Sequence, residues 1–577
     1  SIEPFLADQI EVLKGPATLL YGAGAIGGAV NVVDGRIPTV AAERALSGRA
    51  EVRGGSVADE RTALLRLDGG RGGIAWHLDG FRRDLSDYEI PGFARIEEDH
   101  EDEHAHEEDE HEHEEENPFG LLPNSAVDSR GGAFGLSWIG ERGFVGASIS
   151  RYESLYGIPG GHAHAHEDEH EHEDGHEVDH AHEDEAEGEE DIRIDLAQTR
   201  YDLKAGLRSP FAGFDSLDLR LGVNNYRHIE LEGEEIGTRF DNDAYEGRLE
   251  LVHSPLGDWR GALGAQFSRR DFRAEGEEAF VPPSLTRDLG MFLIEELDRE
   301  AWKLELGARA DRVRVEAEGH QRRSFSSFSA SIGALWRLND LLHLSAGYDR
   351  AQRAPGAEEL FSDGPHAATQ SYEIGDDRLR RETANQLELA AHLHAGRVQA
   401  KLAAFHNRFD DYIFLAETDR EEDGLPVRLW TQQDARFRGL EAEATIDLLD
   451  NASGAWALRL SADRVNARLD DGGRLPRLAP ARFGTGLEWS REGWRAGVDA
   501  KRYQRQDEVA AFEEATPGFT LLGAHLSYHW DVGATGWEVF LRGENLNDRE
   551  ARLHTSVLKN EAPLPGRNVQ FGLRAMF

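Results

Sequence analysis

"DSLDLRLGV" (residues 215–223) alternates strictly between apolar and polar positions, and it sets the pattern for most of the chain. Leucine or valine occupies every second position from Leu217 to Val223, with Asp218 and Arg220 between them. Successive side chains of a strand point to opposite faces, so such a stretch forms a strand with one apolar and one polar wall. Residues 302–313 and 385–396 repeat the pattern.

The same alternating segment recurs from about residue 45 onward. Some of these segments are joined by short turns and others by long polar connections. Short turns are expected at 140–143, 208–214 and 393–397, and long polar connections at 270–287 and 416–427. This arrangement predicts an all-β fold, an antiparallel transmembrane β-barrel. About 24 residues for each strand and its share of loop give about 22 strands. An edge strand of a soluble sandwich is the alternative for the last segment, 568–577. Five tryptophans near strand ends suit the two membrane interfaces: Trp76, Trp138, Trp302, Trp336 and Trp430.

Composition narrows the classes of partner and ligand. The 577 residues carry a formal net charge of −45, which argues against nucleic acid as a partner and favours cations. There is no cysteine, so imidazole, carboxylate and carbonyl groups are the available metal ligands. The sequence shows no Ser-His-Asp spacing, phosphate-binding loop or HExxH motif, and we expect neither enzymatic activity nor an organic cofactor.

Two tracts of histidine, aspartate and glutamate interrupt the strands, at about residues 97–116 and 161–191. These two His/acid tracts hold 13 of the 25 histidines and 29 of the 109 acidic residues, and no Lys or Arg. Two pairs of alternate histidines folded together would supply the four ligands of a tetrahedral zinc site. So many equivalent ligands indicate weak, exchangeable sites on loops too charged to fold without metal. The alternatives are a solvated acidic loop, and a loop that buffers metal without transport.

Residues 9–33, "QIEVLKGPATLLYGAGAIGGAVNVV", depart from the repeating strands. They predict a strand at 10–13, a break at Gly15-Pro16, a helical turn at 17–20 and a second strand entered through closely spaced glycines. This run resembles the end of the plug domain in TonB-dependent outer-membrane receptors. The alternating segment that ends at Phe577 likewise resembles the sorting signature of bacterial outer-membrane barrels.

The resemblance implies a 22-stranded barrel at residues 45–577, with the C-terminal part of a plug at residues 1–44. It also implies a monomer in the bacterial outer membrane, surrounded by lipid. The first two-thirds of a plug and the TonB-contacting segment are expected to be missing, so partnership with the TonB complex would require a segment outside this sequence.

A second resemblance lies in residues 353–382, "RAPGAEELFSDGPHAATQSYEIGDDRLRRE". Together with "NRFDDYIF" at 407–414 and "HTSVLKNEAPLPGRN" at 554–568, this segment resembles ZnuD-type zinc-uptake receptors, which also carry external loops rich in His and acidic residues. Haem receptors have a similar layout, with a histidine between the RAP motif and an Asn-Pro motif. Here "GDDRL" replaces the Asn-Pro motif, which disfavours haem without excluding it.

Metal ligands are therefore expected at two levels. A tighter site facing the lumen is expected at His366 with Glu358 and Glu359, whose alternative role is to fold an external loop. The lone histidines His406 and His554 are more often structural. The capture set in the tracts is His100, His104, His106, His111, His113, His162, His164, His166, His170, His172, His176, His180 and His182.

The sequence thus predicts an outer-membrane, TonB-dependent transporter that imports zinc, free or loosely chelated. Imidazole sites bind copper and nickel at least as well, so the preference for zinc rests on the resemblance. A haem or siderophore receptor is one alternative, and a surface metal-binding protein without import is another.

Overall fold

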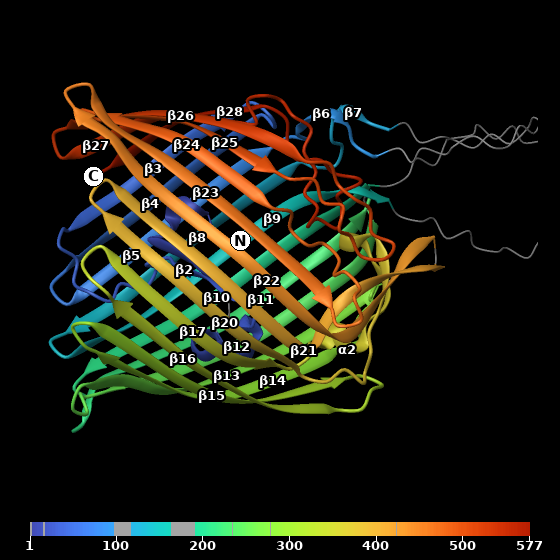
Figure 1. The fold of residues 1–577 in the computed structure, drawn as a ribbon, viewed down its shortest axis with the longest axis horizontal. Helices are drawn as coiled ribbons and strands as arrows, with labels where there is room; N and C mark the ends of the chain where they lie inside the picture. The colour runs from blue at the N-terminus through green and yellow to red at the C-terminus, as the bar shows by residue number, and fades with distance from the viewer. Residues whose placement is uncertain are drawn as a thin grey trace, which may run out of the picture.

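The computed structural model describes residues 3–14, 18–96, 117–162, 191–233, 235–276, 278–422 and 424–577. Twenty-two antiparallel strands close into a single barrel, which confirms the predicted fold (Figure 1). In chain order they are β3 (Leu46–Gly55), β4 (Glu60–Arg71), β5 (Ile74–Leu85), β8 (Val127–Gly140), β9 (Gly143–His162), β10 (Asp191–Arg208), β11 (Phe214–Glu232), β12 (Glu235–His253), β13 (Trp259–Gly276), β14 (Ser284–Asp298), β15 (Trp302–Ala317), β16 (Arg323–Arg337), β17 (Leu342–Arg353), β20 (Glu382–Ala395), β21 (Val398–Glu422), β22 (Leu425–Asn451), β23 (Gly454–Leu469), β24 (Arg482–Arg491), β25 (Trp494–Tyr503), β26 (Phe519–Val532), β27 (Thr535–Glu544) and β28 (Asn568–Met576).

The register of the strands follows the alternation in the sequence. Leu219 of β11 lies opposite Ala205 of β10 and Leu249 of β12, so apolar side chains match apolar ones on the outer face. A shift of one residue would turn every one of these side chains into the lumen, and this fixes the pairing.

Short turns gather at one end of the barrel and long connections at the other, left and right in Figure 1. The predicted turns at 140–143, 208–214 and 393–397 are confirmed. The long loops predicted at 270–287 and 416–427 are wrong, because most of these residues extend the strands of the β13–β14 and β21–β22 hairpins. β21 and β22 contain 25 and 27 residues, whereas a membrane span needs about 10. Beyond the membrane both faces meet water, so the alternation that reveals a strand disappears.

The N-terminal residues lie inside the barrel (Figure 1). The elements are η1 (Pro4–Leu6), β1 (Gln9–Lys14), α1 (Thr18–Tyr21), η2 (Ala23–Ala25) and β2 (Gly28–Val33), and β1 pairs antiparallel with β2. The predicted order of strand, helical turn and strand is confirmed. Ile26 packs in a buried cluster with Phe409, Ala435 and Ala467 of the wall, and the Arg66 side chain donates to the Leu6 carbonyl at 2.9 Å.

Several short elements lie at the end of the barrel that carries the long connections. They are β6 (Glu89–Phe93), β7 (Phe119–Leu121), α2 (Ala357–Phe361), β18 (Asp363–His366), η3 (Ala367–Thr369) and β19 (Ser371–Ile374). β18 and β19 form a hairpin outside the ring, and β19 lies parallel to β22. In the described part of the chain, no helix is long and apolar enough to cross a membrane.

The tryptophans divide between the two faces of the wall. Trp138, Trp302 and Trp336 are exposed near the short turns, as expected of an interfacial girdle. The prediction that Trp430 lies at a membrane interface is wrong. Its side chain packs against a buried cluster around Phe361, and its indole N–H donates to Glu373 at 3.2 Å.

Candidate functional site

His366 lies at the end of the barrel with the long connections, in the hairpin Asp363–Ile374, called here the His366 hairpin. Its ring stacks on Phe280 with 4.2 Å between centroids, and its Nδ1 lies 2.9 Å from Glu373 Oε1. The side chain is 27% exposed. Because Nδ1 faces the carboxylate, Nε2 is the ring nitrogen left for a ligand, as in histidines oriented by a neighbouring acid.

Glu373 is buried, and three side chains hold its carboxylate. Thr369 Oγ1 donates to Oε1 at 2.9 Å, and the Trp430 indole donates to Oε2. Burial alone would raise the pKa of Glu373, but the hydrogen bonds and the charge from His366 outweigh it and lower that pKa. The carboxylate therefore stays ionised and fixes the orientation of the His366 ring.

A second histidine, His228 of β11, lies beside the same aromatic cluster. It stacks on Phe240 with 4.3 Å between centroids, and Phe240 and Phe280 share one buried cluster. Its Nε2 is 4.0 Å from Glu230 Oε1, and burial first, with the neighbouring His366 second, lowers the pKa of His228 to about 4. Sequence reasoning assigned His228 no functional role, because only the fold brings it near His366.

The two carboxylates expected beside His366 have other partners. Glu358 pairs with Arg270 of β13 at 2.8 Å, and Glu359 pairs with Arg353 at 2.9 Å. Glu359 also accepts the Gly356 N–H at the start of α2. Glu373, which sequence reasoning missed, takes the place expected for them next to His366; its position seven residues after the histidine gave no signal.

The histidines predicted in the His/acid tracts lie outside the described residues, apart from the backbone of His162 at the end of β9. The described residues that flank the tracts can be placed. Ala367 of the His366 hairpin shares a buried cluster with Ile158 and Ile192, which flank the second tract. Gln370 also donates to the Pro159 carbonyl at 3.3 Å.

The residues before the first tract contact the connection between β27 and β28. The Ile96 N–H donates to the Asn560 carbonyl at 2.9 Å, and Arg95 lies 3.5 Å from Glu561. Glu561 also lies beside Gly160, two residues before His162. The described flanks of the second tract therefore contact the His366 hairpin, and Glu561 links the flank of the first tract to them. Among described side chains, no group of three or more His, Asp or Glu is gathered closely enough to hold a metal ion.

His554 has a structural role, in line with its interpretation from sequence. Its Nε2 lies 3.1 Å from Glu513, whose carboxylate also faces Lys559 Nζ at 3.3 Å. Glu513 further accepts the backbone N–H groups of Arg477 and Ala510 at 2.7 and 3.0 Å. Three external connections, 470–481, 504–518 and 545–567, thus meet at one buried carboxylate, called here the Glu513 junction.

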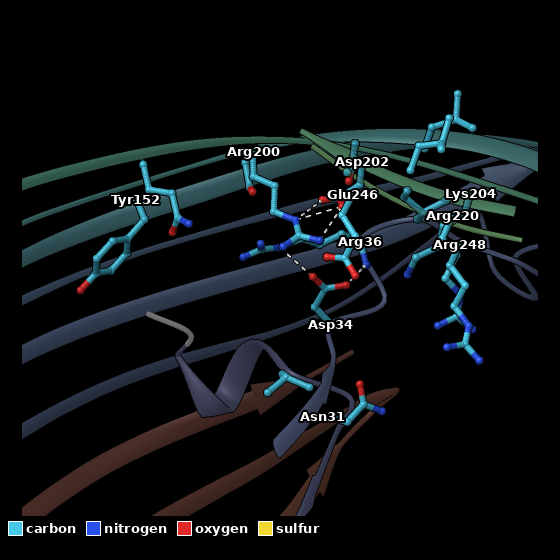
Figure 2. Close-up of a pocket in the computed structure, with 18 of the residues that line it drawn as sticks. Asn31, Asp34, Arg36, Tyr152, Arg200, Asp202, Lys204, Arg220, Glu246 and Arg248 are labelled. Carbon is cyan, nitrogen blue, oxygen red and sulfur yellow. Dashed lines mark hydrogen bonds and ion pairs between the residues drawn. The ribbon is translucent and has the colours of Figure 1, made fainter. Parts of the chain in front are cut away.

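A cavity of about 690 Å³ lies between the N-terminal residues and the wall of the barrel. Figure 2 shows Arg36 and Arg200 beside Asp34 and Asp202. No histidine occurs among the described residues that line the cavity. The described lining of the cavity is therefore rich in charged side chains and offers no imidazole to hold a metal.

Lys204, Arg220 and Arg248 gather on one side of this cavity (Figure 2). They lie directly opposite one another across β10, β11 and β12. Arg248 pairs with Glu250 at 2.7 Å, but within the described structure neither Lys204 nor Arg220 has a carboxylate at ion-pair distance. Like charges in directly opposed positions destabilise a sheet, so this row raises the energy of the wall.

Comparison with known proteins identifies the family. The model described as "TonB dependent receptor-like, beta-barrel" matches residues 116–546, and that of the "TonB-dependent Receptor Plug Domain" matches residues 1–29. A heme/hemopexin utilization protein C of Haemophilus influenzae is 25% identical over 217 residues, which span 33% of this chain and 30% of that protein.

Solved structures share the whole architecture. The copper transporter OprC superposes with a TM-score of 0.79 at 18% identity, covering 100% of this chain and 89% of that one. The FrpB iron transporter of Neisseria meningitidis (F3-3 variant) gives 0.75 at 14% identity, covering 100% and 88%. Such identities establish the fold alone. With the family model matched over most of the chain, the protein belongs to the TonB-dependent receptors, whose barrels lie in the bacterial outer membrane.

Proposed function

We propose that this protein imports a divalent metal, zinc in the first place, which the His/acid tracts capture and the His366 hairpin receives. The carrying observation is that the described flanks of the second tract contact this hairpin. The flank of the first tract lies nearby, because Arg95 pairs with Glu561, which lies beside Gly160. An ion released from the second tract then has a short path to a histidine whose Nδ1 is already held.

The chemistry of the tracts suits capture and exchange. Neutral imidazoles with carboxylates nearby bind Zn²⁺ well, and the abundance of ligands keeps each site weak enough to release the ion. Copper and nickel bind such sites at least as tightly, so we rest selectivity for zinc on the resemblance to zinc-uptake receptors and on metal availability.

We assign His366 the role of a receiving ligand through Nε2, with Glu373 holding the ring. His228 and Glu230 are the nearest further donors, and they would have to move towards His366 to share an ion with it. Such an adjustable site fits a transported ion better than a resident one, because the ion must leave again.

Deletion of residues 97–116 and 163–190 tests capture. In cells starved of zinc, the deletion should lower accumulation of radioactive zinc, while the barrel still migrates as a folded, heat-modifiable band. Import then depends on energy from the TonB complex, as in the family, so the wild-type rate should vanish when that energy source is removed. Unchanged accumulation in the deletion would contradict the proposal.

Glu373→Gln tests the receiving site. Removing an acid that orients a metal-binding histidine weakens metal binding by about 10- to 100-fold, so zinc binding to the tract-deleted protein should fall by that factor. His529→Ala is the matched control, because His529 is a half-exposed histidine near the short turn after β26 with its own acid, Asp531. Equal affinities in the two variants would refute the role of Glu373.

A haem receptor is a second candidate, favoured by a specific observation. His366 and His228 each stack on a phenylalanine of one buried cluster, and an apolar aromatic site with a free imidazole nitrogen suits a haem plane and its iron. An intense haem absorption band in the purified protein that His366→Ala removes would support this candidate over zinc.

A further inference from the structure

The outward face of β21, β22 and β23 changes from apolar to basic towards the long connections. Leu402 and Ala442 lie opposite each other, and the next row places Leu440 opposite Arg464. Beyond it, Arg438 lies between His406 and Asn466, and the following row consists of Arg408, Arg436 and Arg468. We call the five arginines and His406 the basic patch.

The basic patch points away from the lumen. Phe409, Ala435 and Ala467 are buried in the lumen against Ile26. Each of them is next in sequence to an arginine of the last row, and alternate residues of a strand face opposite sides. Arg408, Arg436 and Arg468 are accordingly exposed on the outer wall.

The basic patch lies where the apolar belt ends. Leu402 and Leu440 are 55% and 57% exposed on the outer face, as lipid-facing residues of a barrel are. β21 begins at the short-turn end and runs towards the long connections, so the arginines follow the leucines in the direction of the cell exterior. The patch therefore lies level with the headgroups of the outer leaflet.

Most of the positive charge in the basic patch lacks a protein partner. Arg436 pairs with Asp470 at 2.7 Å and Arg408 with Asp410 at 3.4 Å. Arg438 donates to His406 at 3.3 Å instead of to an acid. Within the described part of the chain, no carboxylate lies at ion-pair distance from Arg438, Arg464 or Arg468. Arginines set directly opposite one another repel, so an anion bound there would relieve the cost.

A groove of about 430 Å³ opens within the basic patch. Its lining includes His406, Arg438 and Arg464, with Leu440 as an apolar side chain. An acyl chain fits against Leu440, while the arginines reach the headgroup to which that chain is attached. Guanidinium groups bind phosphate through paired hydrogen bonds, which makes phosphate the matching anion.

We propose that the basic patch binds a phosphorylated lipid of the outer leaflet. Arg438, Arg464 and Arg468 hold its phosphate groups, and an acyl chain lies along Leu440 and Leu402. A free phosphate ion would leave the apolar part of the groove unused, which is why we assign the site to a lipid. This site is separate from the proposed metal path, and it stands whether or not zinc is the cargo.

The test compares two triple variants of the full chain in detergent micelles. Arg438→Gln, Arg464→Gln and Arg468→Gln together remove the unpaired cations. The control carries Arg82→Gln, Arg130→Gln and Arg239→Gln, which are outward arginines at the same end, each with an acid partner at 3.2, 2.6 and 2.8 Å. Heat-modifiable migration on a gel checks that both barrels fold.

Binding is measured by native mass spectrometry with lipid A, an acylated glucosamine disaccharide that carries phosphates. We expect the patch variant to bind about tenfold more weakly or worse, because each charge-assisted hydrogen bond contributes over a factor of ten. The control variant should bind lipid A as tightly as the wild type does. Dephosphorylated lipid A should bind poorly to the wild type. Equal binding by the two variants, equal binding of the dephosphorylated lipid, or full competition by millimolar inorganic phosphate would overturn the proposal.

Discussion

Glu513→Gln should loosen the external face of the barrel at the Glu513 junction. The substitution keeps the size of the side chain but removes the charge that faces His554 and Lys559. Burial by itself would raise the pKa of Glu513, but the bonds from His554, the backbone N–H groups and the charge of Lys559 lower it from 4.5 to about 2. At about 1.4 kcal/mol for each pKa unit, the ionised carboxylate stabilises the junction by about 3 kcal/mol.

Limited proteolysis measures this effect. When opening is fast compared with cleavage, the cleavage rate follows the population of the open form, so about 3 kcal/mol corresponds to roughly a hundredfold. Trypsin at pH 8 should therefore cleave after Arg477 and Lys559 about a hundred times faster in Glu513→Gln, as followed by mass spectrometry of the peptides.

The pH dependence supplies the control. Because the folded state lowers the pKa, the stabilisation is complete above pH 4.5 and is lost as pH falls towards 2. At pH 2, pepsin should cleave the connections of the variant and the wild type at the same rate. Equal cleavage at pH 8, or a difference that persists at pH 2, would refute the reasoning.

Three further outcomes are expected. Lys204→Glu should raise the free energy of unfolding in urea by about 0.5–1 kcal/mol, because an ion pair replaces the repulsion from Arg220; a decrease would show that the row is compensated. Gly135→Ala should destabilise the barrel by about 1–3 kcal/mol in the same titration, because its Cβ would lie 1.7 Å from the Arg36 carbonyl oxygen. Zinc capture, measured by equilibrium dialysis, should weaken as pH falls through about 6.5, since binding needs neutral imidazole; capture that persists at pH 5 would point to carboxylates as the ligands.

The barrel could be predicted from sequence because its constraint is local. Leu217, Leu219 and Leu221 alternate with polar residues because one face of their strand meets lipid and the other the lumen, and this pattern is visible within a single strand. The alternation fails in β21 beyond the membrane, where the successive residues Asp419 and Arg420 are both exposed to water. That is the reason residues 416–427 were expected to form a loop.

The candidate site could be predicted only in part. His366 stood out through its motif, but its partner Glu373 and its neighbour His228 are brought there by the hairpin and by β11. Glu358 and Glu359 were attractive as acids close in sequence. Glu358 pairs instead with Arg270, which is distant in sequence. The spacing of residues along the chain could not predict this ion pair.

The barrel closes through β28 and β3, and this has a consequence for assembly. The Val569 N–H donates to Ser56 Oγ across 513 positions of the chain, and seven residue pairs complete the ring. Joining ends this far apart costs on the order of 5 kcal/mol in chain entropy before any of those bonds form. Until the last strand is available, β3 and the growing end both present unpaired backbone edges that invite aggregation. A chain stopped short of β28 therefore keeps two unpaired strand edges and cannot form the closed ring.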